Sequence, residues 1–435
     1  MPGRITRDRC STTRFELATT VPFVAAVSPI AKQLSDSAIR PIDPPTSPMR
    51  IVRSVGPGLI VAGSIVGSGE LIATTKAGAE AGFTLLWLIL IGCVVKVFTQ
   101  IELGRYAIIS GKTTLRALDE VPGPRIKGRG NWLVWYWLVM WLAGISQLGG
   151  IVGSVGQALA ISAPLTQIGV DYNKVADVET LQHFEESNQD IESMWQDYRA
   201  KHPAGDASSN ARGATPKDAA IWAAIIAVAT SGILLMGRYG LIQSLSTVLV
   251  GSFTVITVVN LFMLQGQPDW RVSMSEFIGG LKFSIPHVEN AAPIGTALAT
   301  FGLIGVGASE LVVYPYWCLE KGYARFTGKY DGSPEWQKRA AGWMHVMRVD
   351  AWGAMVIYTF ATIAFYLLGA ATLNRVGLNP EGNDLVRTLW VMFLPVFSQW
   401  ASAVFLFGAF AVLYSTFFVA NASNARTFTD AMSVV

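Results

Sequence analysis

The fold is decided by residues 63–72, which read Gly63-Ser64-Ile65-Val66-Gly67-Ser68-Gly69-Glu70-Leu71-Ile72. They lie within an apolar run, 56–80, and about 20 apolar residues suffice for a helix to cross the hydrocarbon layer. Glycines weaken a helix in its interior, and here a glutamate follows them directly. The sequence therefore predicts a membrane span that is interrupted beside a buried carboxylate.

A second apolar run carries the same arrangement. Residues 302–312 read Gly302-Leu303-Ile304-Gly305-Val306-Gly307-Ala308-Ser309-Glu310-Leu311-Val312. The two runs are the first and the sixth of the chain. Two interrupted helices in corresponding positions are typical of an inverted repeat, in which they form a binding site at the bilayer midplane.

The composition agrees with a polytopic all-α membrane protein. Of the 435 residues, 51% are hydrophobic and only 14% are charged, and the apolar runs are continuous rather than alternating, which excludes a transmembrane β-barrel. We expect eight spans, at 56–80, 83–110, 131–163, 219–236, 241–264, 292–319, 349–371 and 397–424.

The spans divide the chain into three parts. Residues 1–50 are expected to form a disordered cytoplasmic extension, 51–264 the first repeat with spans 1 to 5, and 292–435 a partial second repeat with spans 6 to 8. Within the first repeat, 165–218 is an extracytoplasmic insert with ten acidic and five basic residues. We expect it to be helical around 178–199 and disordered around 204–214.

Basic residues predict the orientation. Eight lie before residue 54, and further clusters follow the second span, at 112–129, and the sixth, at 321–348. With eight spans these segments share one side, which is cytoplasmic by the positive-inside rule. The chain is therefore expected in the plasma (inner) membrane with a cytoplasmic N-terminus.

Several function classes lack support in the sequence. The net charge is +3, without a basic stripe for nucleic acid. There is no Walker loop, zincin motif or serine-nucleophile elbow, so neither an enzyme nor a resident cofactor is expected. The expected partners are the lipid bilayer and a small solute, and the oligomeric state is left open.

The interrupted spans supply the candidate binding groups. Unwound backbone survives in a membrane only where it lines a cavity or meets a ligand, and a carboxylate there needs a cation, a proton or a basic partner. The predicted binding residues are Gly67, Ser68, Glu70, Gly307, Ser309 and Glu310, with Glu70 and Glu310 as metal ligands. Lys76, Gln147 and Tyr314 are candidate charge or coupling partners.

Another interpretation of the same motifs is structural. Glycine-rich motifs also serve close helix packing. On this interpretation the two glutamates are protonated, or paired with Lys76, Lys96 or Arg105.

The first two spans resemble those of the Nramp family of divalent-metal transporters. The resemblance rests on Gly56-Pro57-Gly58, on Ala77-Gly78-Ala79 and on Gly82-Phe83-Thr84-Leu85-Leu86-Trp87, and it extends over 51–435 with the insert as an addition. It implies a LeuT-type fold with discontinuous spans 1 and 6. That fold has at least ten spans, so we expect its last spans to be missing from this chain.

The binding motifs differ from those of the family. Its first-span Asp-Pro-Gly-Asn motif aligns with Gly67-Ser68-Gly69-Glu70, and its sixth-span Met-Pro-His-Asn motif aligns with Gly307-Ala308-Ser309-Glu310. Its third-span proton-path acids fall at Gln147 and Gly150. Without the soft methionine ligand, carboxylate and carbonyl oxygens favour Mg²⁺, Ca²⁺ or Mn²⁺.

Three functions remain open at this stage. The first is a secondary transporter of a divalent metal cation, which is the substrate that the resemblance implies. The second is a transporter of a small organic cation or amino acid on the same fold. The third is a membrane sensor that binds without transport.

Overall fold

The computed structural model describes residues 41–126, 129–187, 216–235, 239–285, 295, 298–299, 301–302, 304–380 and 382–435. Residues from Arg40 to Val435 form one compact unit. The disorder predicted for residues 1–40 and 204–214 falls outside the described residues.

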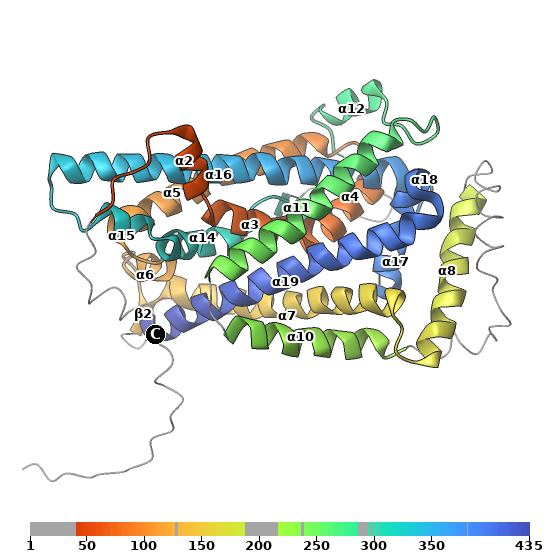
Figure 1. The fold of residues 1–435 in the computed structure, drawn as a ribbon, viewed down its shortest axis with the longest axis horizontal. Coiled ribbons are helices and arrows are strands. Elements are labelled where there is room, and N and C mark those ends of the chain that lie inside the picture. The colour runs from red at the N-terminus through yellow and green to blue at the C-terminus, as the bar shows by residue number, and fades with distance from the viewer. Residues whose placement is uncertain are drawn as a thin grey trace, which may run out of the picture. The chain divides into compact units, whose positions relative to one another are not determined.

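The described chain is almost entirely helical, as predicted (Figure 1). Among the described residues, six helices are long and apolar enough to cross a membrane. They are α5 (Leu86–Ser110), α7 (Trp132–Ser162), α10 (Asp218–Leu235), α11 (Tyr239–Leu264), α16 (Pro334–Leu368) and α19 (Ala401–Val434). This confirms a polytopic all-α membrane protein.

A bent pair of helices provides a further span. It consists of α3 (Pro57–Ile65) and the segment Gly69–Ala81, which meet at an angle of 40°. The second segment begins as a π-helix, η1 (Gly69–Thr74), and continues as α4 (Thr75–Ala81). The predicted interruption of the first span is confirmed.

The remaining elements lie before or between the spans. The helices are α2 (Pro48–Ser54), α6 (Thr114–Asp119), α8 (Gln167–Ser187), α12 (Met274–Gly280), α14 (Ala308–Lys321), α15 (Tyr323–Thr327), η4 (Gly369–Leu373), α17 (Leu385–Trp390) and α18 (Leu394–Phe397). Three 3₁₀ turns are η5 (Gly382–Asp384), η6 (Val391–Phe393) and η7 (Ser398–Trp400). Strands β1 (Arg125–Ile126) and β2 (Arg129–Asn131) form a small antiparallel pair.

Of the eight predicted spans, six appear as single long helices and the first as the bent pair. The sixth, 292–319, is described only in part, and its helix α14 (Ala308–Lys321) is shorter than a membrane-crossing helix. The bounds of the other helices follow the apolar runs closely, with two exceptions. Helix α16 begins at Pro334 rather than 349, because Ser333 caps it by accepting a hydrogen bond from the Trp336 N–H at 3.1 Å. Helix α19 continues to Val434 rather than 424. Both extensions are amphipathic, so a hydropathy window does not detect them.

The insert and the N-terminal segment also differ from expectation. Helix α8 covers 178–187 of the predicted helix but begins earlier, at Gln167, and the predicted residues 188–199 lie outside the described part of the chain. Asp218 ties the start of α8 to α10 by accepting hydrogen bonds from the Leu165 and Thr166 N–H groups. Residues 41–50, assigned to the extension, contact the helices: the Ile42 N–H donates to the Phe326 carbonyl.

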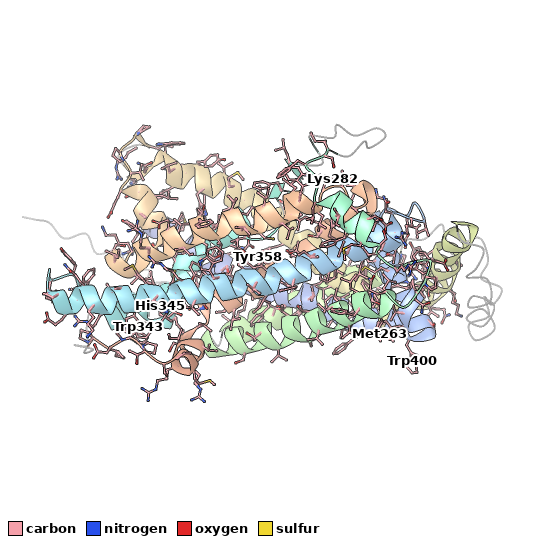
Figure 2. The ribbon with its side chains drawn as sticks, turned by 90° about the horizontal axis from the view of Figure 1, so that it is seen from above. Met263, Lys282, Trp343, His345, Tyr358 and Trp400 are labelled. Atoms are coloured by element: carbon pink, nitrogen blue, oxygen red, sulfur yellow. The ribbon has the colours of Figure 1, made fainter. Side chains whose placement is uncertain are left out.

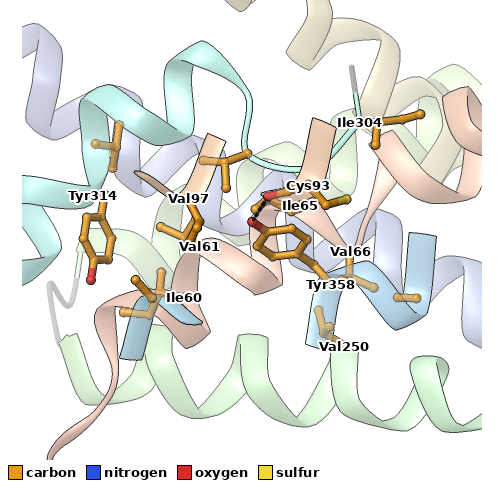
Figure 3. Close-up of a cluster of buried hydrophobic side chains, with 14 of the residues drawn as sticks. Ile60, Val61, Ile65, Val66, Cys93, Val97, Val250, Ile304, Tyr314 and Tyr358 are labelled. Carbon is orange, nitrogen blue, oxygen red and sulfur yellow. Dashed lines mark hydrogen bonds between the residues drawn. The ribbon is translucent and has the colours of Figure 1, made fainter. Parts of the chain in front are cut away.

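The broken first span lies among the other helices. Helix α3 contacts α11, α14, α16 and α19, and nearly all its residues are buried. Figure 3 shows Ile60, Val61 and Ile65 of α3 in one apolar cluster with side chains of α5, α11 and α16. In this cluster the Tyr358 hydroxyl donates to the Cys93 carbonyl at 3.2 Å, which fixes α16 to α5.

Large apolar side chains also cover the outside of the helices. Val228 is 75% exposed and Phe262 74% exposed, on helices whose other faces pack inward. Exposed apolar surface of this extent fits contact with lipid rather than water.

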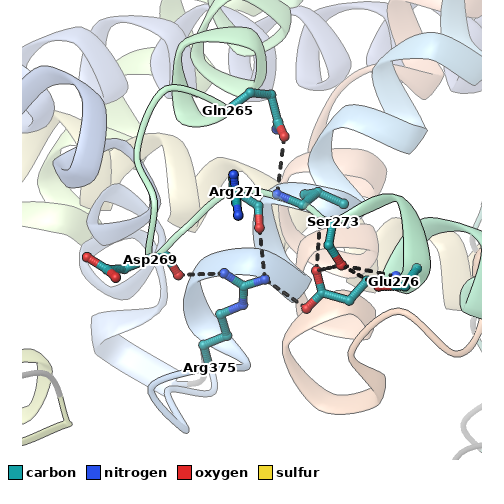
Figure 4. A network of polar contacts seen from close by, with 8 residues as sticks. Gln265, Asp269, Arg271, Ser273, Glu276 and Arg375 are labelled. Carbon is teal, nitrogen blue, oxygen red and sulfur yellow. Dashed lines mark hydrogen bonds and ion pairs between the residues drawn. The ribbon is translucent and has the colours of Figure 1, made fainter.

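The two ends of the helices differ in their connections. Figure 2 shows Trp343 and His345 near one end of α16, and Met263, Lys282 and Trp400 toward the opposite end. At that second end Arg375 donates to the Asp269 carbonyl at 2.6 Å and to Glu276 at 2.8 Å (Figure 4). This arginine joins the segment after η4 to the connection between α11 and α12.

Candidate cation-binding site

The break in the first span is a turn at Val66 and Gly67. Helix α3 ends at Ile65, and the Gly67 N–H donates to the Ile65 carbonyl at 2.7 Å instead of continuing the helical pattern. The next segment starts with Glu70 in its first turn. As a result, carbonyl groups at the end of α3 have no helical partner.

Hydroxyl groups of α19 satisfy part of this freed backbone. Ser415 donates to the Gly63 carbonyl at 3.2 Å, and Thr416 donates to the Ser64 carbonyl at 3.2 Å. The Thr416 oxygen also accepts from the Ser68 N–H at 3.3 Å. One threonine therefore binds both sides of the break.

The contact between Thr416 and the first break requires a glycine at position 67. A Cβ atom placed on Gly67 would lie 1.4 Å from Oγ1 of Thr416 and 2.8 Å from its Cβ. The glycine therefore permits the close approach of α19, in addition to weakening the helix.

The second break lies before α14. Gly305 adopts a left-handed conformation with φ of +67°, and α14 begins at Ala308 with Gly307 as its N-cap residue. Glu310 lies in the first turn of α14, where the positive end of the helix dipole favours a carboxylate. The predicted interruption of this segment is therefore present between Ile304 and Gly307.

A cavity of about 260 Å³ lies between the two breaks. Its polar lining consists of side chains from four segments: Ser64, Ser68, Gln147, Ser309, Glu310, Thr416, Ser423 and Asn424. Glu310 accepts hydrogen bonds from the Ser64 hydroxyl at 3.2 Å and the Ser309 hydroxyl at 3.3 Å. Two hydroxyls thus orient the carboxylate of the cavity.

Glu70 lies outside this lining. It is fully buried, and its Oε1 lies 3.1 Å from the Thr362 hydroxyl of α16. Its Oε2 has no hydrogen-bond partner among the described residues. The structure therefore does not bring Glu70 and Glu310 together in one lining, contrary to the two-glutamate arrangement expected from the sequence.

The other predicted residues divide in the same way. Ser68, Gly307, Ser309 and Gln147 line the cavity, whereas Gly67 packs against α19.

Two predicted charge or coupling partners bind elsewhere. Lys76 pairs with Glu80 at 3.6 Å, because it lies beyond the π-helical turn, in the first turn of α4. The Tyr314 hydroxyl donates at 3.2 Å to Asp350, a residue of α16 that contacts the start of α3. Neither residue lines the cavity.

The donor set of the cavity contains oxygen and amide groups without sulfur or imidazole. Methionine, cysteine and histidine are absent from its lining. Over the described part of the chain, no three His, Cys, Asp or Glu side chains converge as a metal cluster would require. A cation held here would be coordinated by one carboxylate together with hydroxyl, amide and backbone oxygens.

Four polar lining residues were not among the predicted binding residues. They are Ser64 of the interrupted first span and, in the last span, Thr416, Ser423 and Asn424. A helical pattern could have revealed the last two, because Thr416, Val419, Ala420, Ser423 and Asn424 recur at spacings of three and four on one face of α19.

Solved structures with this architecture exist. The fold of this chain resembles that of a manganese transporter. A histidine-to-alanine variant of the Eremococcus coleocola manganese transporter matches with a TM-score of 0.55 at 13% identity, over 91% of this chain and 69% of that chain. A glutamate-to-glutamine variant matches equally, and the complex with an aromatic bis-isothiourea compound matches with a TM-score of 0.53 and the same identity and coverage.

Sequence comparisons give no further relationship. No family model matches the chain, and no curated protein matches it. The similarity is therefore one of fold alone.

Proposed function

We propose that this protein is an Nramp-like secondary transporter of a hard divalent cation, with Mg²⁺, Mn²⁺ and Ca²⁺ as the candidates. The observation that carries the proposal is the position of Glu310, on the wall of a cavity formed by two interrupted spans. Oxygen ligands suit these ions, and the hydroxyls of Ser64 and Ser309 orient the carboxylate that would bind them. The resemblance of the fold to a manganese transporter supports the same substrate class.

Glu70 has a different role in this proposal. The Thr362 hydroxyl lies 2.7 Å from the Tyr358 carbonyl and 3.1 Å from Glu70. A hydroxyl has one proton, and a carbonyl can only accept, so both contacts are hydrogen bonds when Glu70 carries a proton. A neutral acid also avoids the cost of an unpaired buried carboxylate. We assign Glu70 as a protonated residue behind the cavity wall, and Glu310 as the ligand.

The orientation expected from the sequence belongs to the same proposal. The ends of α5 and α14 that carry the basic segments lie on the side at which α3 begins. We assign this side to the cytoplasm.

Uptake into proteoliposomes tests the proposal. Radioactive Mn²⁺ uptake, with Mg²⁺ and Ca²⁺ as competitors, is measured for the full chain and for Glu310→Gln, Glu70→Gln and Glu102→Gln. We expect Glu310→Gln to lower uptake at least tenfold, because it removes the charged ligand at constant size. Glu70→Gln should retain cation binding, because a neutral amide replaces a neutral acid. Glu102→Gln is the matched control, since Glu102 is exposed and pairs with Arg105.

Three outcomes would overturn parts of this proposal. Unchanged uptake in Glu310→Gln would exclude it as the ligand. Saturable binding of Mn²⁺ without uptake would indicate a sensor. Uptake of an organic cation or amino acid in place of the three ions would indicate the alternative substrate, for which a cavity of about 260 Å³ has room.

A further inference from the structure

The Lys96 side chain contacts backbone carbonyls within residues 301–304, directly before the second break. It lies on α5, and its Nζ donates to the Phe301 carbonyl at 2.7 Å and the Ile304 carbonyl at 2.6 Å. The Gly302 carbonyl lies 3.4 Å from the same atom. Three carbonyl oxygens of one short segment therefore converge on a single ammonium group.

The local backbone explains why these carbonyls are available. Gly305 turns the chain out of helical conformation, and the last carbonyls of a helix lack intrahelical partners and carry the negative end of its dipole. Within a membrane no water is at hand to satisfy them. Figure 3 shows Ile304 close to Cys93, which precedes Lys96 by three residues on α5.

The ligand set around the ammonium is that of a monovalent cation. Carbonyl oxygens at unwound helix ends coordinate alkali-metal ions in transporters and channels. The Phe301 ring adds a further favourable surface, because Nζ lies 5.1 Å from its centroid. A lysine ammonium is a compact point charge with three donors, which matches the three oxygens.

This tethered charge lies beside the cavity. Gly302 and Gly305 belong to the cavity lining, and Lys96 binds the carbonyl of Gly302 and of Ile304, the residue before Gly305. A charge held here by the chain cannot leave with the substrate, as a free ion would.

We propose that the carbonyls of Phe301, Gly302 and Ile304 form a monovalent-cation site whose occupant is the Lys96 ammonium. The protein therefore needs no free monovalent cation at this break. When the ammonium group is removed by substitution, the three carbonyls should bind a free monovalent cation. This inference does not depend on which substrate the cavity binds.

Thermal unfolding of purified full-length protein tests the site. Wild type, Lys96→Ala, Lys96→Met and Lys76→Ala are compared in choline chloride and, at equal ionic strength, in NaCl, KCl and methylammonium chloride. We expect Lys96→Ala to unfold at a lower temperature in choline than wild type. At least one of the three small cations should raise its midpoint saturably, by about 3 °C or more.

The controls separate a cation site from an ordinary helix cap. Lys96→Met loses the charge but leaves a side chain in the space, so its response to the small cations should be weak. Lys76→Ala removes a lysine that pairs with Glu80, and should respond as wild type does. A lysine that only caps the helix end predicts a lower midpoint in Lys96→Ala with no cation-specific recovery, and that result would overturn the proposal.

A folding failure also gives an answer. If Lys96→Ala is recovered as monodisperse protein in KCl or methylammonium chloride but not in choline chloride, the proposal is supported. If it is recovered in none of these salts, the same titration is made on Lys96→Gln, whose shorter neutral amide leaves part of the site open. The absence of a saturable, cation-specific shift in that variant would overturn the proposal.

Discussion

The Asp350 carboxylate caps the first half of the broken span, since its Oδ2 accepts a hydrogen bond from the Gly58 N–H at 2.6 Å. Its Oδ1 accepts from the Gly56 N–H at 2.8 Å. The two bonds satisfy N–H groups at the start of α3 and place a negative charge at the positive end of its dipole. A side chain of α16 therefore sets the position of α3.

Asp350→Asn tests this cap. The amide keeps the size of the side chain but removes the charge. Its NH₂ group is a donor and cannot accept a hydrogen bond, so one of the two backbone N–H groups loses its partner. Because hydrogen bonds to charged groups contribute about 1.5–3 kcal/mol, we expect the free energy of unfolding to fall by about 2 kcal/mol. Thermal or denaturant unfolding in detergent measures this change.

Tyr314→Phe is the matched control for the cap. It removes the hydroxyl that donates to Asp350 at 3.2 Å but leaves both backbone bonds in place. We expect a smaller loss, about 1 kcal/mol. Equal stability of Asp350→Asn and wild type would show that the cap does not stabilise α3.

The sequence predicted the breaks better than it predicted the direction of the side chains. Glycines before Glu70 and Glu310 located both interruptions, because a helix is weakened locally by its own residues. Whether Glu70 faces the cavity depends on the turn at Val66 and on the π-helix that follows, which shift the helical phase. Local composition does not encode that phase, so Glu70 was expected to line the site and instead lies toward Thr362.

The contributions of distant helices were likewise not predictable from local motifs. Lys96 was considered only as a counter-charge for the glutamates, whereas it binds the carbonyls before the second break. Thr416 lies within the predicted last span, but its two bonds across the first break depend on the packing of α19 against Gly67.

Gly67→Ala should disrupt this packing. The new methyl group would collide with Thr416, so α19 must move or the break must close. We expect the variant to lose the Mn²⁺ binding proposed for the wild type, together with a destabilisation of about 1–3 kcal/mol. Gly149→Ala is the control, because a Cβ at Gly149 of α7 meets nothing within 4 Å. If the two variants bind Mn²⁺ equally in a calorimetric titration, the close approach is not essential.

Arg387→Met should release the insert helix. Arg387 is 2% exposed; it forms an ion pair with Asp177 and donates to Asn173 at 2.6 Å, both on α8. The Asp177 side chain is 28% exposed, so the loss of stability should be smaller than the value of about 3–5 kcal/mol typical of a fully buried pair, but without these contacts α8 should become accessible to protease. Limited proteolysis followed by mass spectrometry locates the cleavage. Arg125→Met, which loses an exposed pair with Asp119, should leave α8 protected, and equal cleavage in both variants would contradict the assignment.

Ionisation of Glu276 on α12 should make the stability of the protein depend on pH. Partial burial raises the pKa of its carboxyl, but hydrogen bonds from Ser273 and from Arg375 outweigh this and hold the pKa below its ordinary value of 4.5. A depressed pKa means that the ionised form stabilises the fold: the contribution is complete above pH 4.5 and is lost as the pH falls through the lower folded value.

We expect the unfolding midpoint of wild type to fall more steeply below pH 4.5 than that of Glu276→Gln, in which this group no longer titrates. Arg375→Met should show a reduced slope as well, because the pKa of Glu276 then moves back toward 4.5. Parallel pH profiles for the three proteins would show that this network does not contribute to stability.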